Sequence, residues 1–273
     1  MNKKLIFIIS ISILITAGLY ILIKNVSFKS NKSAPNAASA RQLFELAKGQ
    51  ELNNELLLAK ATYREIINNY PDYREIQDVE KKIEDLNTRI IFLPTLIAPT
   101  SIFYFVAPGD SLNKIAREFN TTVELISKIN MLKSGIIRPG IKLKIWTGKF
   151  SVLVDKSQNI LMLKSDNEII KVYTVSTGIN NSTPVGAFKI KDRIVNPPWF
   201  KPGAPKPIPA GNPENILGTR WLGFDLPSYG IHGTIDPKTL GQQVTNGCVR
   251  MKNEDVEELF SLLPPDTEVT IID

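Results

Sequence analysis

The sequence is poor in the residues that build redox and metal sites. Its 273 residues include one cysteine, Cys248, and one histidine, His232. A single cysteine cannot form an intramolecular disulfide, and it excludes tetrahedral zinc sites that need two or more thiolates, so we expect no metal ion. The chain offers one thiol and one imidazole, and the question is whether they belong to the same site.

Strong charge of one sign is also missing from the compact parts of the chain. Lys and Arg number 33 and Asp and Glu number 27, but residues 1–37 hold five lysines and no acidic residue. Residues 149–273 carry 13 basic and 14 acidic side chains. Much of the basicity is therefore an N-terminal flank, as expected beside a membrane, and we expect no nucleic-acid partner. The 43% of hydrophobic residues excludes a wholly disordered chain.

One long hydrophobic run lies near the N-terminus, from Leu5 to Ile23, without a charged residue and with lysines on both sides. At about 1.5 Å per residue, the run is just long enough to cross a bilayer core of roughly 30 Å. We interpret residues 1–24 as an uncleaved signal anchor, with a cleaved signal peptide and a buried core helix as the alternatives. Residues 25–37, rich in Ser and Asn, follow as a solvated tether. The cytoplasmic membrane is thus an expected partner.

Residues 38–91 have the apolar periodicity of helices, interrupted at Pro71 and Asp72. The part AKATYREIINNYP, from Ala59 to Pro71, resembles the second helix of a tetratricopeptide repeat. The match covers about one and a half repeats, fewer than the three or so that a stable solenoid needs. Two interpretations stay open: a small helical spacer that packs on itself, and a groove that binds a protein partner.

Residues 102–147 have the pattern of a strand, two short helices and a closing strand. Asp110 or Ser111 can cap the first helix, and Thr121 with Glu124 makes a capping box for the second. The sequence GDSL at residues 109–112 could also be the nucleophile motif of a GDSL-type hydrolase, with Ser111 as the nucleophile. Such a serine requires a partner histidine, and the one histidine of the chain, His232, is a better partner for Cys248.

This stretch resembles a lysin-motif (LysM) domain over its whole length. The resemblance rests on the opening YFVAPGDSL, the TTV before the second helix, Asn130 after that helix, and the RPG before the last strand. It implies a β-α-α-β module that binds N-acetylglucosamine-containing glycans. The loops Pro108–Ser111 and Asn130–Ile136 would wall a shallow groove, with Pro108, Gly109, Asp110 and Asn130 as the glycan-binding residues.

After Trp146 the pattern becomes β-like, with alternating apolar residues and frequent turn signals. We expect antiparallel hairpins in a sandwich or barrel over residues 149–273, and no parallel α/β sheet. Residues 197–213 include seven prolines. Such a segment is either a stiff connector or a loop that frames a substrate channel.

The segment IHGTIDPKTLGQQVTNGCVRM, from Ile231 to Met251, has the residues needed for acyl transfer through a cysteine. A free thiol titrates near 8.5, so Cys248 needs a base, and His232 can serve as one. Gly247 permits close approach of the substrate, and the N–H groups around Cys248 are candidate oxyanion donors. Arg250 would project to the side of Cys248 and bind a carboxylate, or brace the loop against acidic residues such as Glu254. A lone cysteine is otherwise most often a small buried hydrophobe.

Residues 149–273 resemble the L,D-transpeptidase catalytic domain. The motifs, in order, are TPVGAFKI, NPENILGTRWLG, YGIHGT and TNGCVRM. The resemblance implies that Cys248 is the nucleophile, His232 the general base, Gly233 the carbonyl that orients the imidazole, and Arg250 a site arginine. Thr245, Asn246 and Gly247 would line the substrate site. Asn246 departs from the family, many members of which have a second histidine there.

The implied reaction forms 3,3 cross-links between peptidoglycan stem peptides through a cysteine thioester, without a metal or organic cofactor. An L,D-carboxypeptidase or cross-link hydrolase, and a non-catalytic wall-binding scaffold, are the alternatives. We therefore expect a multidomain α+β protein with an N-terminal membrane helix, a short all-α segment, the β-α-α-β module and a β-rich catalytic sandwich. Its expected place is the cell envelope, anchored in the cytoplasmic membrane with the catalytic domain outside.

Overall fold

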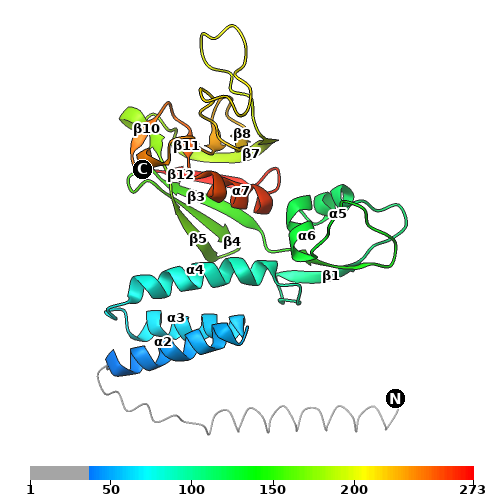
Figure 1. Cartoon of the computed structure of the whole chain (residues 1–273), viewed down its shortest axis with the longest axis vertical. Coiled ribbons are helices and arrows are strands. Elements are labelled where there is room, and N and C mark those ends of the chain that lie inside the picture. The colour runs from blue at the N-terminus through cyan, green and yellow to red at the C-terminus, as the bar shows by residue number, and fades with distance from the viewer. Residues whose placement is uncertain (1–36) are drawn as a thin grey trace, which may run out of the picture.

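The computed structural model describes residues 37–273, and Figure 1 shows them as three parts. A helical segment leads into a small module of two strands and two helices, and a larger β-rich domain follows. The predicted signal anchor and nearly all of the predicted tether lie outside the described residues. Within residues 37–273, no helix is long and apolar enough to span a membrane.

The helical segment consists of α2 (Ala37–Leu52), α3 (Leu56–Asn69) and α4 (Ile76–Phe92). The predicted break at Pro71 and Asp72 is confirmed, because both residues lie between α3 and α4. The three helices share an apolar core that includes Tyr63, Ile66 and Leu86.

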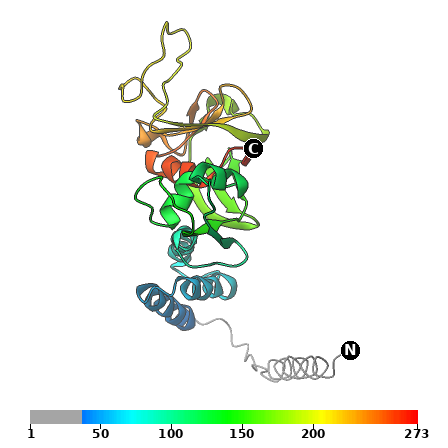
Figure 2. The same cartoon turned by 90° about the vertical axis from the view of Figure 1, so that its right-hand side faces the viewer.

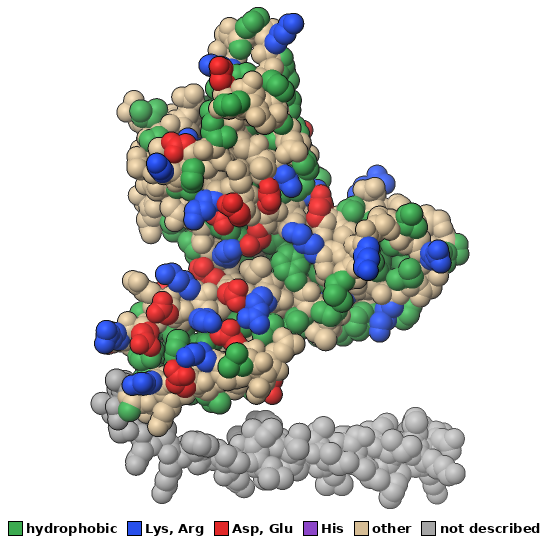
Figure 3. Space-filling view, in the orientation of Figure 1, with side chains coloured by type: hydrophobic (Ala, Val, Ile, Leu, Met, Phe, Trp, Pro, Cys, Tyr) green, Lys and Arg blue, Asp and Glu red, His purple; other side chains and the backbone are tan. Residues whose placement is uncertain are grey.

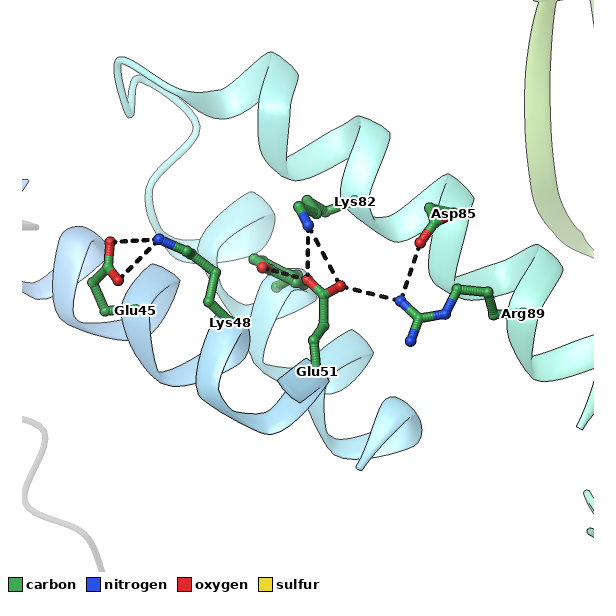
Figure 4. Close-up of polar contacts among 7 residues, drawn as sticks. Glu45, Lys48, Glu51, Lys82, Asp85 and Arg89 are labelled. Carbon is green, nitrogen blue, oxygen red and sulfur yellow. Dashed lines mark hydrogen bonds and ion pairs between the residues drawn. The ribbon is translucent and has the colours of Figure 1, made fainter. Parts of the chain in front are cut away.

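Glu51 ties α2 to its neighbours at the surface of this core (Figure 4). Its carboxylate accepts hydrogen bonds from the Tyr63 hydroxyl at 2.7 Å and from Arg89 at 3.2 Å, and it pairs with Lys82 at 3.3 Å. Burial and the neighbouring carboxylate raise the pKa of the Tyr63 hydroxyl, so it remains a donor at physiological pH.

Helix α4 also covers an edge of the β-rich domain. Strand β5 (Glu168–Thr174) is the terminal strand of the large sheet, and α4 lies along it (Figure 1). Asn87 donates to the carbonyls of Ile169 and Ile170 at 3.1 Å each, and Glu84 accepts from Val172 N at 3.3 Å. Side chains of α4 thus satisfy backbone groups that an edge strand would otherwise leave open to pairing.

The small module has the order β1 (Ser101–Phe105), α5 (Leu112–Glu118), α6 (Val123–Ile129) and β2 (Lys142–Trp146), with β1 and β2 antiparallel. The predicted cap at Ser111 is confirmed: its hydroxyl accepts from Lys114 N at 3.2 Å. The predicted capping box of Thr121 with Glu124 is wrong. Thr122 is the extended residue before α6 and accepts from Leu125 N at 2.9 Å. Glu124 instead pairs with Arg193 of the next domain.

The β-rich domain is built on one eight-stranded sheet of order β11-β9-β8-β7-β12-β3-β4-β5. Its first half has β3 (Phe150–Asp155), β4 (Ile160–Ser165) and β5; its second half has β7 (Gly186–Val195), β8 (Arg220–Phe224), β9 (Gly230–His232) and β11 (Val249–Arg250). Helix α7 (Asn253–Leu262) lies between the two halves, which form separate layers (Figures 1 and 2). The expected β-rich sandwich is therefore present.

The expectation of antiparallel hairpins alone is wrong for three strand pairs. The last strand, β12 (Glu268–Ile272), inserts beside β3 and runs parallel to it. Strand β11 is parallel to β9, and the short β10 (Gln243–Thr245) is parallel to β6 (Thr177–Gly178). Each of these pairs joins segments that are distant in the chain, so local turn signals could not reveal them. Two 3₁₀ turns, Ile179–Asn181 and Pro237–Thr239, complete the elements.

The helical segment and the small module both contribute residues to the apolar core of the β-rich domain. The cluster that fills the β-rich domain includes Ile91 of α4, Leu125 and Ile129 of α6, and Trp146 of β2. Lys144 of β2 is 1% exposed, and its ammonium donates to the carbonyls of Ile91 and Leu93 at the end of α4. Desolvation in this position lowers the pKa of Lys144 to about 8. The small module is therefore packed into the larger domain rather than tethered to it.

Candidate active site

Cys248 lies in the tight turn between β10 and β11, half-buried in a cleft of about 330 Å³. The hydroxyl of Thr245 donates to the Cys248 carbonyl at 2.7 Å and accepts from Gly247 N at 3.1 Å, which closes the turn. Gly247 has φ +122°, and a Cβ there would lie 2.7 Å from a ring carbon of Tyr229. Glycine is thus required beside the thiol by both backbone conformation and space.

The predicted partners of Cys248 lie in the same cleft. Its lining includes His232, Thr245, Asn246 and Arg250. Thr245 has its hydroxyl engaged with the turn, whereas Asn246 is exposed at the cleft wall. The structure therefore brings together the thiol, the imidazole and the guanidinium that the sequence places up to 18 positions apart.

His232 is held in one orientation. It ends β9, is 3% exposed, and stacks on Trp221 of β8 with ring centroids 6.0 Å apart. Its Nδ1 lies 2.7 Å from the Gly233 carbonyl, the contact that the resemblance implied. A carbonyl only accepts, so Nδ1 carries the proton and Nε2 is left as the basic nitrogen.

Burial keeps both reactive groups neutral. Desolvation lowers the pKa of His232 to about 4, and the charge of Arg250 acts in the same direction. Desolvation raises the pKa of the Cys248 thiol to about 11, partly offset by the N–H of Gly230. The thiol donates to the Ser228 carbonyl at 3.5 Å. At pH 7 the Cys248 thiol and the His232 imidazole are therefore both neutral.

Arg250 lies directly beside His232 in the β11–β9 pairing. One terminal nitrogen donates to the Thr239 hydroxyl. Among residues 37–273, no ion pair joins Arg250 to Glu254, and Asp236 is the acidic residue whose charge acts on the guanidinium. Its buried Nε has no partner within residues 37–273. Desolvation lowers the pKa of Arg250, with Asp236 opposing it. Arg250 lines the cleft, and a guanidinium is suited to bind a carboxylate.

Asn253, the first residue of α7, was missed by the sequence reasoning. Its Oδ1 accepts from the N–H groups of Thr219 and Thr234 at 3.2 Å each, and its Nδ2 donates to the Thr234 carbonyl at 2.9 Å. A Cβ at Gly218 or Gly233 would lie about 2 Å from Oδ1, within 2.2 and 2.1 Å respectively. One amide therefore clamps the backbone on both sides of His232. The sequence offered one signal of this contact: Gly218 and Gly233 each precede a threonine, Thr219 and Thr234, in the recognised motifs.

The proline-rich segment 197–213 borders the thiol and extends away from the sheet (Figures 1 and 2). Trp199 and Ile208 pair through their backbones at 2.8 Å, so the segment doubles back on itself. Trp199 and Phe200 line both the 330 Å³ cleft and a second cleft of about 430 Å³, and Cys248 lines both as well. Of the two earlier readings, a loop that frames a substrate channel fits this position.

The residues expected to bind glycan lie in the small module and do not join the Cys248 cleft. Pro108 and Gly109 are exposed. The Asp110 carboxylate accepts from Tyr104, Ala107 N and Lys114 at 2.6 to 2.8 Å, and these bonds lower its pKa to about 2. Asn130 donates to the Ile126 and Lys144 carbonyls and accepts from Lys144 N, all at 2.8 Å. The Asp110 and Asn130 side chains are thus engaged in shaping the loops.

Comparison with known proteins assigns both domains. The family model described as the L,D-transpeptidase catalytic domain matches residues 149–271, and the LysM domain model matches residues 104–146. YkuD of Bacillus subtilis, named as an L,D-transpeptidase, is 35% identical over 62% of this chain and 97% of its own length. The chain belongs to the L,D-transpeptidase family.

Further relatives of this L,D-transpeptidase family member carry the same family name. YqjB of Bacillus subtilis is 41% identical over 45% of this chain and 70% of its own length. Among solved structures, an L,D-transpeptidase from Mycobacterium smegmatis is 12% identical, with a TM-score of 0.39, over 49% of this chain and 64% of that one.

Proposed function

We propose that Cys248 is the nucleophile and His232 the general base of a peptidoglycan transpeptidase that forms 3,3 cross-links. The observation that carries the proposal is that the only thiol and the only imidazole of the chain line one cleft, with Nδ1 of His232 bound to the Gly233 carbonyl. With Nδ1 protonated, Nε2 is the nitrogen of His232 that can accept a proton.

The first half-reaction forms the thioester. Sulfur of Cys248 attacks the carbonyl carbon of the third stem residue while its proton passes to Nε2 of His232. Gly247 N is bonded to Thr245, which leaves the N–H of Cys248 as the candidate donor to the oxyanion. When the intermediate collapses, the carbon–nitrogen bond breaks and the terminal D-alanine leaves with the proton from the imidazolium. Arg250 is suited to bind a substrate carboxylate in this step.

The second half-reaction transfers the acyl group. A side-chain amine of another stem attacks the thioester carbon, the carbon–sulfur bond breaks, and the amine proton returns to sulfur through His232. Two clefts meeting at Cys248 favour an amine acceptor over water, because they leave room for a donor and an acceptor peptide at once. An L,D-carboxypeptidase or hydrolase needs the donor cleft alone.

We further propose that the chain works in the cell envelope, anchored in the cytoplasmic membrane with its catalytic domain outside. The uncharged run Leu5–Ile23 with flanking lysines supports an anchor. The LysM domain supports attachment to the glycan that carries the stem peptides, which raises their local concentration. The contacts of α4 with the edge strand β5 favour a spacer role for the helical segment over a groove for a protein partner.

The test is mass analysis of purified disaccharide-tetrapeptides incubated with the full chain. Expected products are free D-alanine and a dimer joined between the third residues of two stems. If the tetrapeptide is converted to tripeptide and no dimer forms, the activity is that of a carboxypeptidase. If wild-type protein leaves the tetrapeptide unchanged, both activities are rejected. Cys248→Ala, which keeps the fold but lacks sulfur, is the matched control.

A further inference from the structure

A second polar cleft lies between the LysM domain and the catalytic domain, and its lining differs from the loops expected to bind glycan. Figure 1 shows α5 and α6 facing the loop that follows α7, and Figure 3 shows the surface hollowed where these two lobes meet. The cleft measures about 900 Å³. Its walls include Asn113, Arg117 and Thr121 on one side and Arg193, Pro264 and Pro265 on the other. No residue of the loops 108–111 and 130–136 lines it.

The two walls of this interdomain cleft are fixed relative to each other. The Thr122 hydroxyl donates to the Ser261 carbonyl across the junction. Arg193 pairs with Glu124 at 3.3 Å, donates to the Phe260 carbonyl, and stacks its guanidinium 4.2 Å from the Phe260 ring centre. A ligand would therefore meet a preformed site and would not have to bring two mobile domains together.

Two buried polar atoms in the walls have no partner within residues 37–273. They are Oγ1 of Thr121, a residue that is 4% exposed, and Nε of Arg193. Buried polar atoms are normally hydrogen-bonded, and each exception calls for an explanation. The N–H of Thr121 bonds to the Ala116 carbonyl, whereas its hydroxyl has no partner among the described residues. Both atoms belong to side chains that line the same cleft.

The remaining charges favour a ligand rich in hydrogen-bond acceptors. Glu124 is paired with Arg193, and Asp266 is paired with Lys191 at 2.6 Å. Arg117 is exposed and uses Nε on the Asn113 carbonyl, which leaves its terminal nitrogens open. Side chains that carry amide, hydroxyl and guanidinium donors thus line the cleft, beside the apolar rings of two prolines. The hydroxyl and acetamido oxygens of a sugar chain can accept hydrogen bonds from these donors.

We propose that this interdomain cleft is a second binding site for the glycan chain of peptidoglycan, held jointly by the LysM and catalytic domains. The identity of the ligand rests on the proposed function. A glycan bound here would fix its orientation relative to the catalytic domain, which a LysM domain on a free linker could not do.

The test measures binding of peptide-free peptidoglycan glycan chains, and separately of soluble N-acetylglucosamine oligomers, to the full chain by calorimetry. Thr121→Val removes the unpartnered hydroxyl and keeps the shape, so affinity should fall roughly 2- to 10-fold. Its melting temperature should stay the same or rise, since no intramolecular bond is lost. Arg117→Ala should weaken binding about as much, whereas Lys81→Ala, an exposed cation on α4, should not.

Wild-type affinity in Thr121→Val, or a loss of binding confined to Lys133→Ala in the loop 130–136, would overturn the proposal. A lower melting temperature of Thr121→Val would also overturn it, because the hydroxyl would then have a partner in the free protein. Acylation of Cys248 by a soluble tetrapeptide is followed in the same preparations. If the wild-type protein is not acylated, the proposed function is rejected, whatever the glycan measurements show.

Discussion

The carbonyl oxygen of Gly233 lies 2.7 Å from Nδ1 of His232, its neighbour in the chain. This contact selects the tautomer with a basic Nε2, and the carbonyl can accept it only because the 233–234 backbone is held by Asn253. The geometry of the proposed base thus depends on a residue 21 positions away, at the start of α7.

Asn253→Ala should slow acylation of Cys248 about 10- to 100-fold, since small displacements of a catalytic group cost that much. Asn253→Asp keeps the acceptor for Thr219 and Thr234 but loses the donor to the Thr234 carbonyl, so it should lie between Ala and wild type. Single-turnover acylation across pH is the measurement. A positioning role predicts a shifted acid limb as well as a lower rate; a lower melting temperature with an unchanged profile would contradict it.

Acidification should protonate His232 in the folded protein only near pH 4, but it should begin to destabilise the fold at about pH 6.5, where the unfolded chain takes up the proton. The folded-state pKa is about 4 against 6.5 when unfolded, so the unfolded chain gains a proton first as pH falls. Stability from this group is complete above 6.5 and is lost as pH falls toward 4, by roughly 3 kcal/mol. Denaturant unfolding at several pH values checks this, with His232→Gln as the variant that should lack this component. Equal slopes in both proteins would refute it.

The Cys248 thiol should react slowly with iodoacetamide at pH 7 and faster as pH rises toward 11, the pKa of the folded thiol. Cys248→Ala should lose both alkylation and the carbapenem adduct to which the family resemblance implies sensitivity. Intact-protein mass spectrometry measures both. Rapid alkylation already at pH 7 would mean that a thiolate–imidazolium pair exists in the free protein.

Arg250→Lys should lower acylation efficiency roughly 10- to 150-fold, because a flexible ammonium replaces a planar guanidinium that can bind a carboxylate with two parallel bonds. Thr239→Val removes the one side-chain hydroxyl that Arg250 contacts and serves as the matched control for bracing. Melting temperature and acylation rate are measured on each variant. An Arg250→Lys protein that is destabilised but kinetically normal would remove Arg250 from substrate binding.

Ile129→Ala should destabilise the catalytic domain as well as the LysM domain, because Ile129 is buried in their common core. The expected loss is about 2 to 4 kcal/mol in one cooperative unfolding transition. Phe105→Ala, at a side chain that is 64% exposed, is the control. Calorimetry with two separate transitions, of which Ile129→Ala moves only one, would show that the domains unfold independently.

The sequence alone determined the features that depend on neighbouring residues. Apolar periodicity and the Pro71–Asp72 break located the helices, and the Ser111 cap located α5. The TNGCVRM and YGIHGT motifs identified the thiol and imidazole, because their chemistry and the need for glycine beside Cys248 are written in adjacent positions.

Tertiary structure decided everything that joins distant segments. The parallel placement of β12 beside β3, the Asn253 clamp, the packing of α6 against α7 and the second cleft at Cys248 all bring together residues that no local pattern relates. The same holds for electrostatics. Whether Cys248 and His232 rest as an ion pair or as neutral groups depends on how much water the folded chain excludes from them, and desolvation is a property of the packed environment rather than of the residues.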